Sequence, residues 1–283
     1  MDLTGRVAVV TGANSGVGRS ATELLRAAGA EVTLVCRDRT RGGRALSEIE
    51  GSRPDAAATL ELADLSCPDS VRGLASRLTE QLARIDILVN NAGLALDRLQ
   101  TTAEGFELTF ATCHLGHFLL TNLLLDRLRG GGRIVNVSST AHRFGDLRRA
   151  PLDRIARGRA WQGGFPAYCD AKLANVLFTA ECARRWSGHG IAANAVHPGV
   201  LATNIWNRSQ GVMALLMRAI TVFMRRADVG GTAVVELIRR SEPGRVSGRY
   251  FHVRAERPPQ PQAADPDLAH DLWERSLVWT GLG

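Results

Sequence analysis

One tyrosine and one lysine lie four residues apart in the run Tyr168-Cys169-Asp170-Ala171-Lys172. The chain has only two tyrosines, and Lys172 is the sole lysine among its 35 Lys and Arg residues. On a helix, positions i and i+4 share one face, so the phenol and the ammonium would lie side by side. A neighbouring cation favours phenolate and would lower the tyrosine pKa from its ordinary value of about 10. The spacing therefore predicts an acid/base pair.

A glycine-rich loop follows the first apolar run of the chain, in the order Thr11-Gly12-Ala13-Asn14-Ser15-Gly16-Val17-Gly18. Glycines let a backbone approach a pyrophosphate closely, and a helix N-terminus supplies free N–H groups and partial positive charge. The spacing Gly-x-x-x-Gly-x-Gly differs from the Gly-x-Gly-x-x-Gly fingerprint. Its position between a strand and a helix nevertheless favours dinucleotide binding over a bare turn.

The second apolar run ends in Cys36-Arg37-Asp38-Arg39, where dinucleotide-binding folds face the adenosine ribose. An acidic residue at this point favours a free 2′-hydroxyl, whereas arginine suits a 2′-phosphate. Because Arg37 comes first, we expect NADP(H) to be favoured over NAD(H). The alternative is a surface arginine, with Asp38 binding the ribose.

These residues need a scaffold, and the chain alternates apolar runs with helical patterns. The expected strands are 6–11, 31–36, 59–62, 86–90, 133–137, 191–196 and 248–253. The expected helices are 16–28, one ending near 50, 68–83, 103–129, 167–186 and 268–276. Continuous apolar strands separated by helices predict a parallel sheet covered on both faces. Right-handed crossovers then give a doubly wound, Rossmann-type α/β fold.

Length and composition limit the other possibilities. The 283 residues predict a single domain, with a cofactor-binding half at 1–140 and a catalytic and substrate half at 141–283. Five cysteines without a Cys-x-x-Cys pair indicate reduced thiols in a cytoplasmic protein, with neither a disulfide framework nor a metal site. No leader and no membrane span is expected, because the first strand starts at once and no apolar run is long enough.

The net charge of +7 and the pI near 9.9 raise nucleic acid or an anionic surface as partners. Nucleic acid is not expected, because the arginines alternate with acidic residues and no basic helix or interleaved aromatic set occurs. The densest basic stretch, residues 143–159, is interpreted as a solvated loop face.

Several motifs occur in order along the chain: the glycine loop, Asn90-Asn91-Ala92-Gly93, Ser138-Ser139, Tyr168-x-x-x-Lys172 and Pro198-Gly199. With these, the chain resembles the short-chain dehydrogenase/reductases over essentially its whole length. Further runs resemble the retinol-dehydrogenase-type branch: Gly116-His117-Phe118-Leu119-Leu120-Thr121, Lys172-Leu173-Ala174-Asn175, His197-Pro198-Gly199, Ser247-Gly248-Arg249-Tyr250-Phe251 and Leu272-Trp273-Glu274.

The resemblance implies a role for each matching residue. Tyr168 would exchange a proton with the substrate oxygen, and Lys172 would bond the nicotinamide ribose. Ser139 would donate a hydrogen bond to that oxygen, with Ser138 as a structural strand-end residue. Asp64 would contact adenine. The full set implied to bind cofactor is Gly12, Asn14, Ser15, Gly16, Val17, Gly18, Arg37, Asp64, Leu65, Asn90, Asn91, Ala92, Gly93, Tyr168, Lys172, Pro198, Gly199 and Thr203.

Cys113 departs from the family, which usually has an asparagine at this position that helps to hold a water beside the lysine. The helix backbone could still supply a carbonyl to that water, which is the favoured interpretation. Alternatively the relay is impaired, because cysteine is a weak hydrogen-bonding group, and the protein is a slow enzyme or a dinucleotide-binding sensor or scaffold. Dehydratase or epimerase chemistry on a nucleotide sugar uses similar residues, but the branch resemblance disfavours it.

A segment at about 203–228 is expected to form a helical lid over the substrate. It contains Trp206 and three of the four methionines, which suit an adaptable apolar wall. We therefore expect an NADP(H)-dependent oxidoreductase that interconverts a lipophilic carbonyl and its alcohol. The lid could instead pack in a dimer or on the core, or dock shallowly on a membrane through its arginines. The two long helices could also pair in a homodimer.

Overall fold

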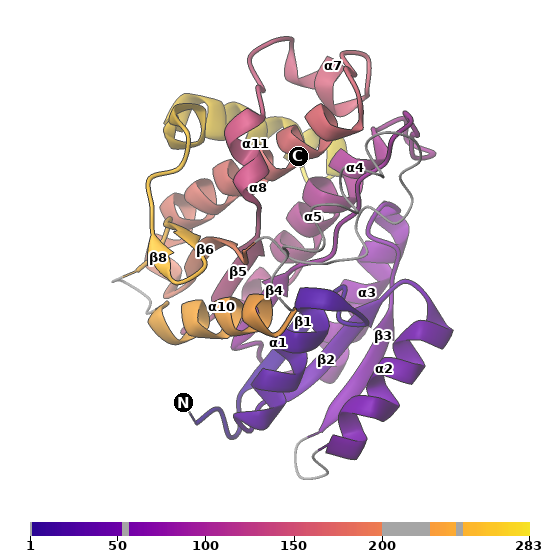
Figure 1. The fold of residues 1–283 in the computed structure, drawn as a ribbon, viewed down its shortest axis with the longest axis vertical. Helices are drawn as coiled ribbons and strands as arrows, with labels where there is room; N and C mark the ends of the chain where they lie inside the picture. The colour runs from indigo at the N-terminus through magenta and orange to yellow at the C-terminus, as the bar shows by residue number, and fades with distance from the viewer. Residues whose placement is uncertain (1, 53–56, 200–226, 242–245) are drawn as a thin grey trace.

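The computed structural model of the protein describes residues 2–52, 57–199, 227–241 and 246–283. Within these residues eight strands form one sheet in the order β3-β2-β1-β4-β5-β6-β7-β8 (Figure 1). The first seven are parallel, and β8 pairs antiparallel with β7. The strands, in chain order, are Val7–Thr11, Glu31–Cys36, Ala58–Leu62, Ile87–Asn90, Arg133–Val137, Ala192–His197, Tyr250–His252 and Ala255–Glu256. The predicted doubly wound α/β fold is confirmed.

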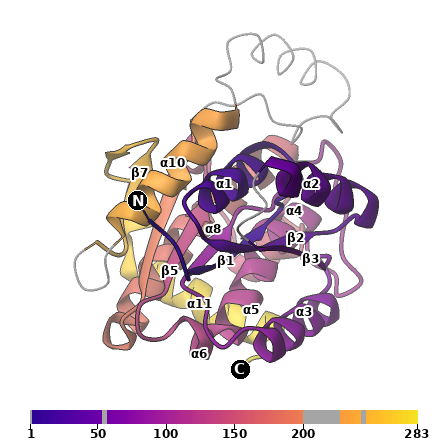
Figure 2. The ribbon, with the colours of Figure 1, turned by 90° about the horizontal axis from the view of Figure 1, so that it is seen from below.

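Helices cover both faces of the sheet. They are α1 Gly16–Ala27, α2 Arg39–Ser52, α3 Pro68–Gln81, α4 Leu108–Phe110, α5 Gly116–Leu123, α6 Leu125–Leu128, α7 Leu152–Ala156, α8 Gly164–Arg185, α10 Ala227–Arg240 and α11 Pro266–Thr280. One apolar core joins the sheet to α1, α2 and α10, and a second joins it to α3, α5 and α8 (Figures 1 and 2). Because both faces are buried, the strands consist of continuous apolar runs.

The predicted helix 103–129 is wrong in its first part and in its continuity. The chain turns at Gly105, whose φ is +81°, and helix starts only at α4. The Glu107 side chain caps this start by accepting hydrogen bonds from the N–H groups of Thr109 and Phe110, at 3.0 and 2.7 Å. A π-helical turn, Ala111–Leu115, then separates α4 from α5. Such turns are frequent at functional sites.

The C-terminal region differs from its prediction in extent. The expected strand 248–253 is shorter, and the chain reverses at Val253 to add β8. The final helix starts earlier than expected, because the Asp265 carboxylate accepts from the N–H groups of Asp267 and Leu268 and Pro266 occupies the first helical position. Helix α10 was not predicted.

The basic stretch 143–159 is only partly a solvated face, which corrects the expectation. Arg149 is 15% exposed and pairs with the 2% exposed Asp170 at 2.6 Å. Arg143 donates to the carbonyl of Pro258 at 2.8 Å, and Arg148 pairs with Asp265. Arginines in this stretch therefore tie a loop to the rest of the chain.

Helix α11 packs on α5 and α8. The Trp273 ring lies 4.9 Å from Phe118 of α5 and 5.8 Å from Phe178 of α8, between ring centroids. Part of the surface that these helices could offer to a second copy is thus covered, and the homodimer stays a prediction. The expected lid at 203–228 lies almost entirely outside the described residues. Among the helices that are described, none has the length and apolar character needed to cross a bilayer.

Candidate active site

Three predicted catalytic residues meet beyond the carboxyl end of β5. Tyr168 and Lys172 lie one turn apart on α8, and the Lys172 Nζ is 5.6 Å from the centroid of the Tyr168 ring. The Lys172 ammonium donates to the carbonyl of Val137, the last residue of β5, at 2.9 Å. The Ser139 side chain hydrogen-bonds the Tyr168 phenol. A serine, a phenol and an ammonium are therefore placed around one point.

The electrostatics of Tyr168 differ from the expectation. Burial raises the pKa of its phenol well above the ordinary value, with a further increase from Cys113 and only partial opposition by the Ser139 hydrogen bond. Burial also lowers the pKa of the Lys172 ammonium. The expectation that Lys172 lowers the Tyr168 pKa is therefore wrong for this structure. At neutral pH the phenol keeps its proton and can donate it.

The structure separates the two neighbouring serines. The Ser138 hydroxyl is 3% exposed and donates to the backbone carbonyl of Lys172 at 2.8 Å, which ties β5 to α8. Ser139 is half-buried and faces Tyr168. Geometry thus favours Ser139 as the residue that reaches a substrate oxygen.

The backbone of the glycine loop is compact and leaves room for a ligand to approach it closely. Gly12 has a φ of +66°, and a Cβ there would lie 2.9 Å from the Cα of Ala92. Ser15 precedes α1 with extended backbone, but its side chain does not cap the helix, and the first turn holds no acidic residue. The Ser15 side chain therefore leaves the first N–H groups of α1 to other acceptors, such as an anion. These features fit the pyrophosphate of a dinucleotide.

Gly18 provides a direct test of this loop. A Cβ at this position would lie 2.4 Å from the Asn91 Nδ2 and 2.5 Å from the Gly12 carbonyl oxygen. We expect Gly18→Ala to lower the free energy of unfolding by about 1–3 kcal/mol and to weaken dinucleotide binding. Gly43→Ala in α2 is the matched control, since nothing lies within 4 Å of its added Cβ, and it should stabilise by up to about 1 kcal/mol. Urea unfolding and nucleotide titration measure both effects; equal behaviour of the two variants would contradict the prediction.

A hydrogen-bonded chain links the glycine loop to the π-helical turn. The backbone N–H groups of Asn91 and Ala92 donate to the Thr11 Oγ1 at 2.9 and 3.0 Å. The Thr11 hydroxyl lies 2.8 Å from the His117 Nε2, and the His117 Nδ1 lies 3.0 Å from the Cys113 carbonyl. Burial lowers the His117 pKa to about 4, so the ring is neutral. A proton on Nδ1 satisfies both contacts.

Cys113 is completely buried beside the lysine. A Cβ built at Gly93 would lie 3.2 Å from the Cys113 Sγ and 3.7 Å from the Lys172 Nζ, so only glycine leaves this space open. The thiol lies 3.6 Å from the carbonyl of Leu94. With its amide in the orientation that satisfies both ends, Asn175 donates to the Cys113 carbonyl at 2.9 Å. Together with His117 this occupies both lone pairs of that carbonyl, which disfavours the expected bond from it to a water.

The residues predicted to face the adenosine lie where β2 and β3 end. The Arg37 Nη1 is 4.0 Å from an Asp64 carboxylate oxygen, and both side chains are partly exposed. The Asp38 carboxylate accepts from the backbone N–H of Arg41 at 2.8 Å and so caps α2. Leu65 is buried, and its carbonyl lies against Gly116 of α5.

The remaining predicted cofactor residues lie in several different parts of the structure. Pro198 and Gly199 follow β6 in buried positions, and Gly199 has a φ of +101°. Asn14 lies in the glycine loop, Val17 is in the core under α1, and Thr203 lies outside the described residues. The Asn90 side chain, expected on the adenosine side, instead donates to Thr121 and Asn136 at 2.9 and 2.8 Å.

Comparisons with known proteins agree with this geometry. A family model described as short chain dehydrogenase matches residues 6–150. The chain is 37% identical to retinol dehydrogenase 12 of Homo sapiens, over 100% of this chain and 88% of that relative. The chain belongs to the short-chain dehydrogenase/reductase family. Its branch is retinol-dehydrogenase-like, as the sequence predicted.

Solved structures share this fold over nearly the whole length of the chain. An uncharacterized protein from Mycobacterium paratuberculosis has a TM-score of 0.78 at 30% identity, covering 99% of this chain and 95% of that one. A short chain dehydrogenase from Burkholderia cenocepacia in complex with NADP has a TM-score of 0.70 at 26% identity, covering 89% and 97%. The protein is therefore an NAD(P)-dependent oxidoreductase that binds a nicotinamide dinucleotide and works by hydride transfer.

Sequence reasoning missed residues that hold the dehydrogenase/reductase site together. Asp170 lies between Tyr168 and Lys172 in the sequence, yet it points away to Arg149 and accepts from the N–H of Asp146 at 3.0 Å. His142 contacts the backbone of Ser139. The sequence offers no signal for the Asp170 contacts, because their partners lie 21 and 24 residues away.

Proposed function

We propose that this protein is an NADP(H)-dependent oxidoreductase that interconverts a lipophilic carbonyl and its alcohol, with Tyr168 as acid/base. The observation that carries the proposal is the meeting of Ser139, Tyr168 and Lys172 next to the glycine loop. The bound nicotinamide supplies the centre that gives or takes the hydride. In the reductive direction, the protonated Tyr168 phenol gives its proton to the substrate oxygen, and the Ser139 hydroxyl donates a hydrogen bond to it.

Lys172 has a supporting role in this proposal. Its ammonium is 2% exposed and is held by the Val137 carbonyl at the end of β5. This holds the ammonium 5.6 Å from the centroid of the Tyr168 ring. The same ammonium is the group that we assign to the nicotinamide ribose. The cofactor set that we assign is the one implied by the sequence resemblance, without Asn90, whose side chain is bonded to Thr121 and Asn136.

Preference for NADP(H) rests on the adenosine end. The Arg37 guanidinium is partly exposed beside Asp64 and can form paired hydrogen bonds with a 2′-phosphate. The Asp38 carboxylate is already used to cap α2, which leaves it less available to a ribose hydroxyl. The similar Burkholderia cenocepacia dehydrogenase is described in complex with NADP.

A lipophilic substrate is supported by an aromatic pair near the phenol. Phe144 is 73% exposed, and its ring centroid is 6.2 Å from that of Phe165. Phe165 packs against the small cluster that contains Tyr168 and Ala141. Exposed aromatic surface of this kind is suited to an apolar ligand, and retinol dehydrogenase 12 is named for such a ligand. Cytoplasmic location stays part of the proposal, on the basis of the five free cysteines.

A second function is a dinucleotide-binding sensor without turnover, and Cys113 favours it. The carbonyl expected to hold a relay water is occupied by His117 and Asn175. The intact arrangement of Ser139, Tyr168 and Lys172 argues for the enzyme.

One experiment separates the two functions. The unmodified protein and Cys113→Asn are mixed with NADPH or NADH and a panel of apolar and small hydrophilic carbonyls, and the loss of reduced nicotinamide is followed. We expect turnover of apolar carbonyls with NADPH by the unmodified protein. A gain of at least about tenfold in Cys113→Asn would show that the relay is impaired. Nucleotide binding without turnover of any carbonyl by either protein would establish the sensor.

A further inference from the structure

The segment that joins β8 to α11 lies along the loop that follows Ser139. We call residues 257–265 the strap and residues 140–149 the serine loop. The loop starts as a short 3-10 helix, Thr140–Phe144, and the Ser139 hydroxyl caps it by accepting from the N–H of Ala141 at 3.2 Å. The strap is about 115 residues away in the sequence, so their contact is a purely tertiary feature.

Gln260 of the strap makes three hydrogen bonds to the part of the serine loop nearest to Ser139. Its side-chain amide donates to the carbonyls of His142 and Gly145 at 2.6 and 2.9 Å. Its backbone N–H donates to the His142 Nε2 at 3.4 Å. The amide thus bridges the first turn of the loop and the point where that turn ends.

His142 links Gln260 to Ser139 by hydrogen bonds. Its side chain is completely buried, and its Nδ1 lies 2.6 Å from the backbone carbonyl of Ser139. The ring packs on Tyr250 of β7 at 4.6 Å between centroids. Burial lowers the His142 pKa, so a neutral ring donates from Nδ1 to Ser139 and accepts at Nε2 from Gln260. The backbone of Ser139 is therefore held by a side chain that the strap itself holds.

The strap is fixed at both ends. Near β8, its Pro258 carbonyl accepts from Arg143 of the serine loop at 2.8 Å. Near α11, Asp265 pairs with Arg148, and the Gln262 amide donates to Asp146 at 2.8 Å.

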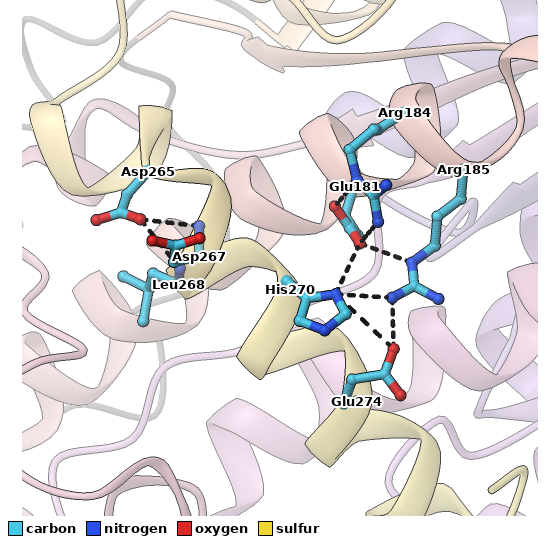
Figure 3. Close-up of polar contacts among 8 residues, drawn as sticks. All are labelled: Glu181, Arg184, Arg185, Asp265, Asp267, Leu268, His270 and Glu274. Carbon is cyan, nitrogen blue, oxygen red and sulfur yellow. Dashed lines mark hydrogen bonds and ion pairs between the residues drawn. The ribbon is translucent and has the colours of Figure 1, made fainter.

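Helix α11 is in turn anchored on α8, as Figure 3 shows. The 2% exposed Glu181 accepts from Arg185 at 2.6 Å, and Arg185 reaches Glu274 of α11. The His270 Nδ1 lies 3.7 Å from the same Glu181 carboxylate. Figure 3 also shows Asp265 capping the start of α11 at the end of the strap. The strap thus runs between β8 and a helix that is anchored on α8, and it is bonded to the serine loop near both of its ends.

We propose that Gln260 and His142 are positioning residues that fix the orientation of Ser139 toward the substrate oxygen. The inference rests on the proposed function, since it concerns the same serine. Because a displacement of about 1 Å at a reacting group can cost up to about 10²-fold in rate, a backbone clamp one hydrogen bond away from Ser139 affects the chemical step more than substrate binding.

The test combines Gln260→Met with Ser139→Ala. Methionine has nearly the length of glutamine but no side-chain donor, so the two amide bonds to the carbonyls of His142 and Gly145 are lost without a cavity, while the backbone N–H bond to the His142 ring stays. We expect Gln260→Met to lower kcat by about tenfold or more, with KM for the carbonyl and Kd for NADPH within about twofold of the unmodified protein. In the Ser139→Ala background the same substitution should have little further effect, because residues that act through one another are not additive.

Gln262→Met is the matched control, because Gln262 binds the same loop farther from Ser139, through the Leu147 N–H and Asp146. It should lower the thermal unfolding temperature about as much as Gln260→Met while keeping kcat. An equal loss of kcat from Gln260→Met with and without Ser139, or an equal loss from Gln262→Met, would show a merely structural strap and overturn the inference. Absence of turnover in the unmodified protein would instead overturn the proposed function, and the positioning role with it.

Discussion

Tyr168→Phe is expected to reduce turnover by about 10²- to 10⁴-fold while the protein still binds its nucleotide. The substitution removes only the hydroxyl, so the ring keeps its buried place beside Ala141 and Cys169. In the proposed mechanism the phenol supplies the proton for the substrate oxygen, and the Ser139 hydroxyl supplies only a hydrogen bond. Burial raises the Tyr168 pKa, so the phenol of the unmodified enzyme is protonated at every pH near neutrality and reduction should show no loss from its ionisation there.

Tyr250→Phe is the matched control, since it also removes one buried phenolic hydroxyl. Tyr250 is 3% exposed, and its hydroxyl has no hydrogen-bond partner among the described residues. Single-turnover kinetics and a nucleotide titration on both variants measure the difference. Normal turnover by Tyr168→Phe, or an equal loss in both variants, would remove Tyr168 from the mechanism.

Arg37→Ala is expected to weaken NADPH binding by about tenfold or more and to leave NADH binding nearly unchanged. Hydrogen bonds to a charged group contribute about 1.5–3 kcal/mol, which corresponds to about 10- to 150-fold in Kd. The lower end applies to this site, because the Arg37 side chain is 50% exposed and water screens its charge. The ratio of the two affinities is the informative quantity, because a general loss of folding would lower both.

Arg44→Ala controls for the removal of one positive charge from the same region. Arg44 lies on α2, is 82% exposed and pairs with Glu48 at 2.7 Å. Calorimetric titration with NADPH and NADH at two salt concentrations would compare the variants. If Arg37→Ala binds both nucleotides as the unmodified protein does, the arginine does not read the 2′-phosphate and the cofactor preference must be assigned again.

The strands were predictable because burial on both faces of the sheet requires continuous apolar runs, and these runs are visible in the sequence. The expected 31–36 and 133–137 agree with β2 and β5, the other expected strands differ by one or two residues at their ends, and β8 was not expected. The pairing of Tyr168 with Lys172 followed from helical spacing alone, since only the period of the helix is needed to bring them together. These features depend on neighbours along the chain.

The features that failed depend on neighbours in space. The helix expected from 103 was prevented by the buried Glu107 carboxylate, which caps α4. The Tyr168 pKa rises because the surrounding core excludes water, and no count of nearby charges in the sequence contains that information. Likewise, the bond between Gln260 and His142 joins residues 118 apart.

The unique lysine has a practical consequence. Reagents that acylate or alkylate amines normally label many exposed lysines, but here the only lysine side chain is 2% exposed and bound to the Val137 carbonyl. Covalent modification of that amine must wait for the surrounding packing to open. Its rate, read by mass spectrometry on one peptide, therefore reports directly how often the interior beneath the phenol becomes accessible to bulk solvent.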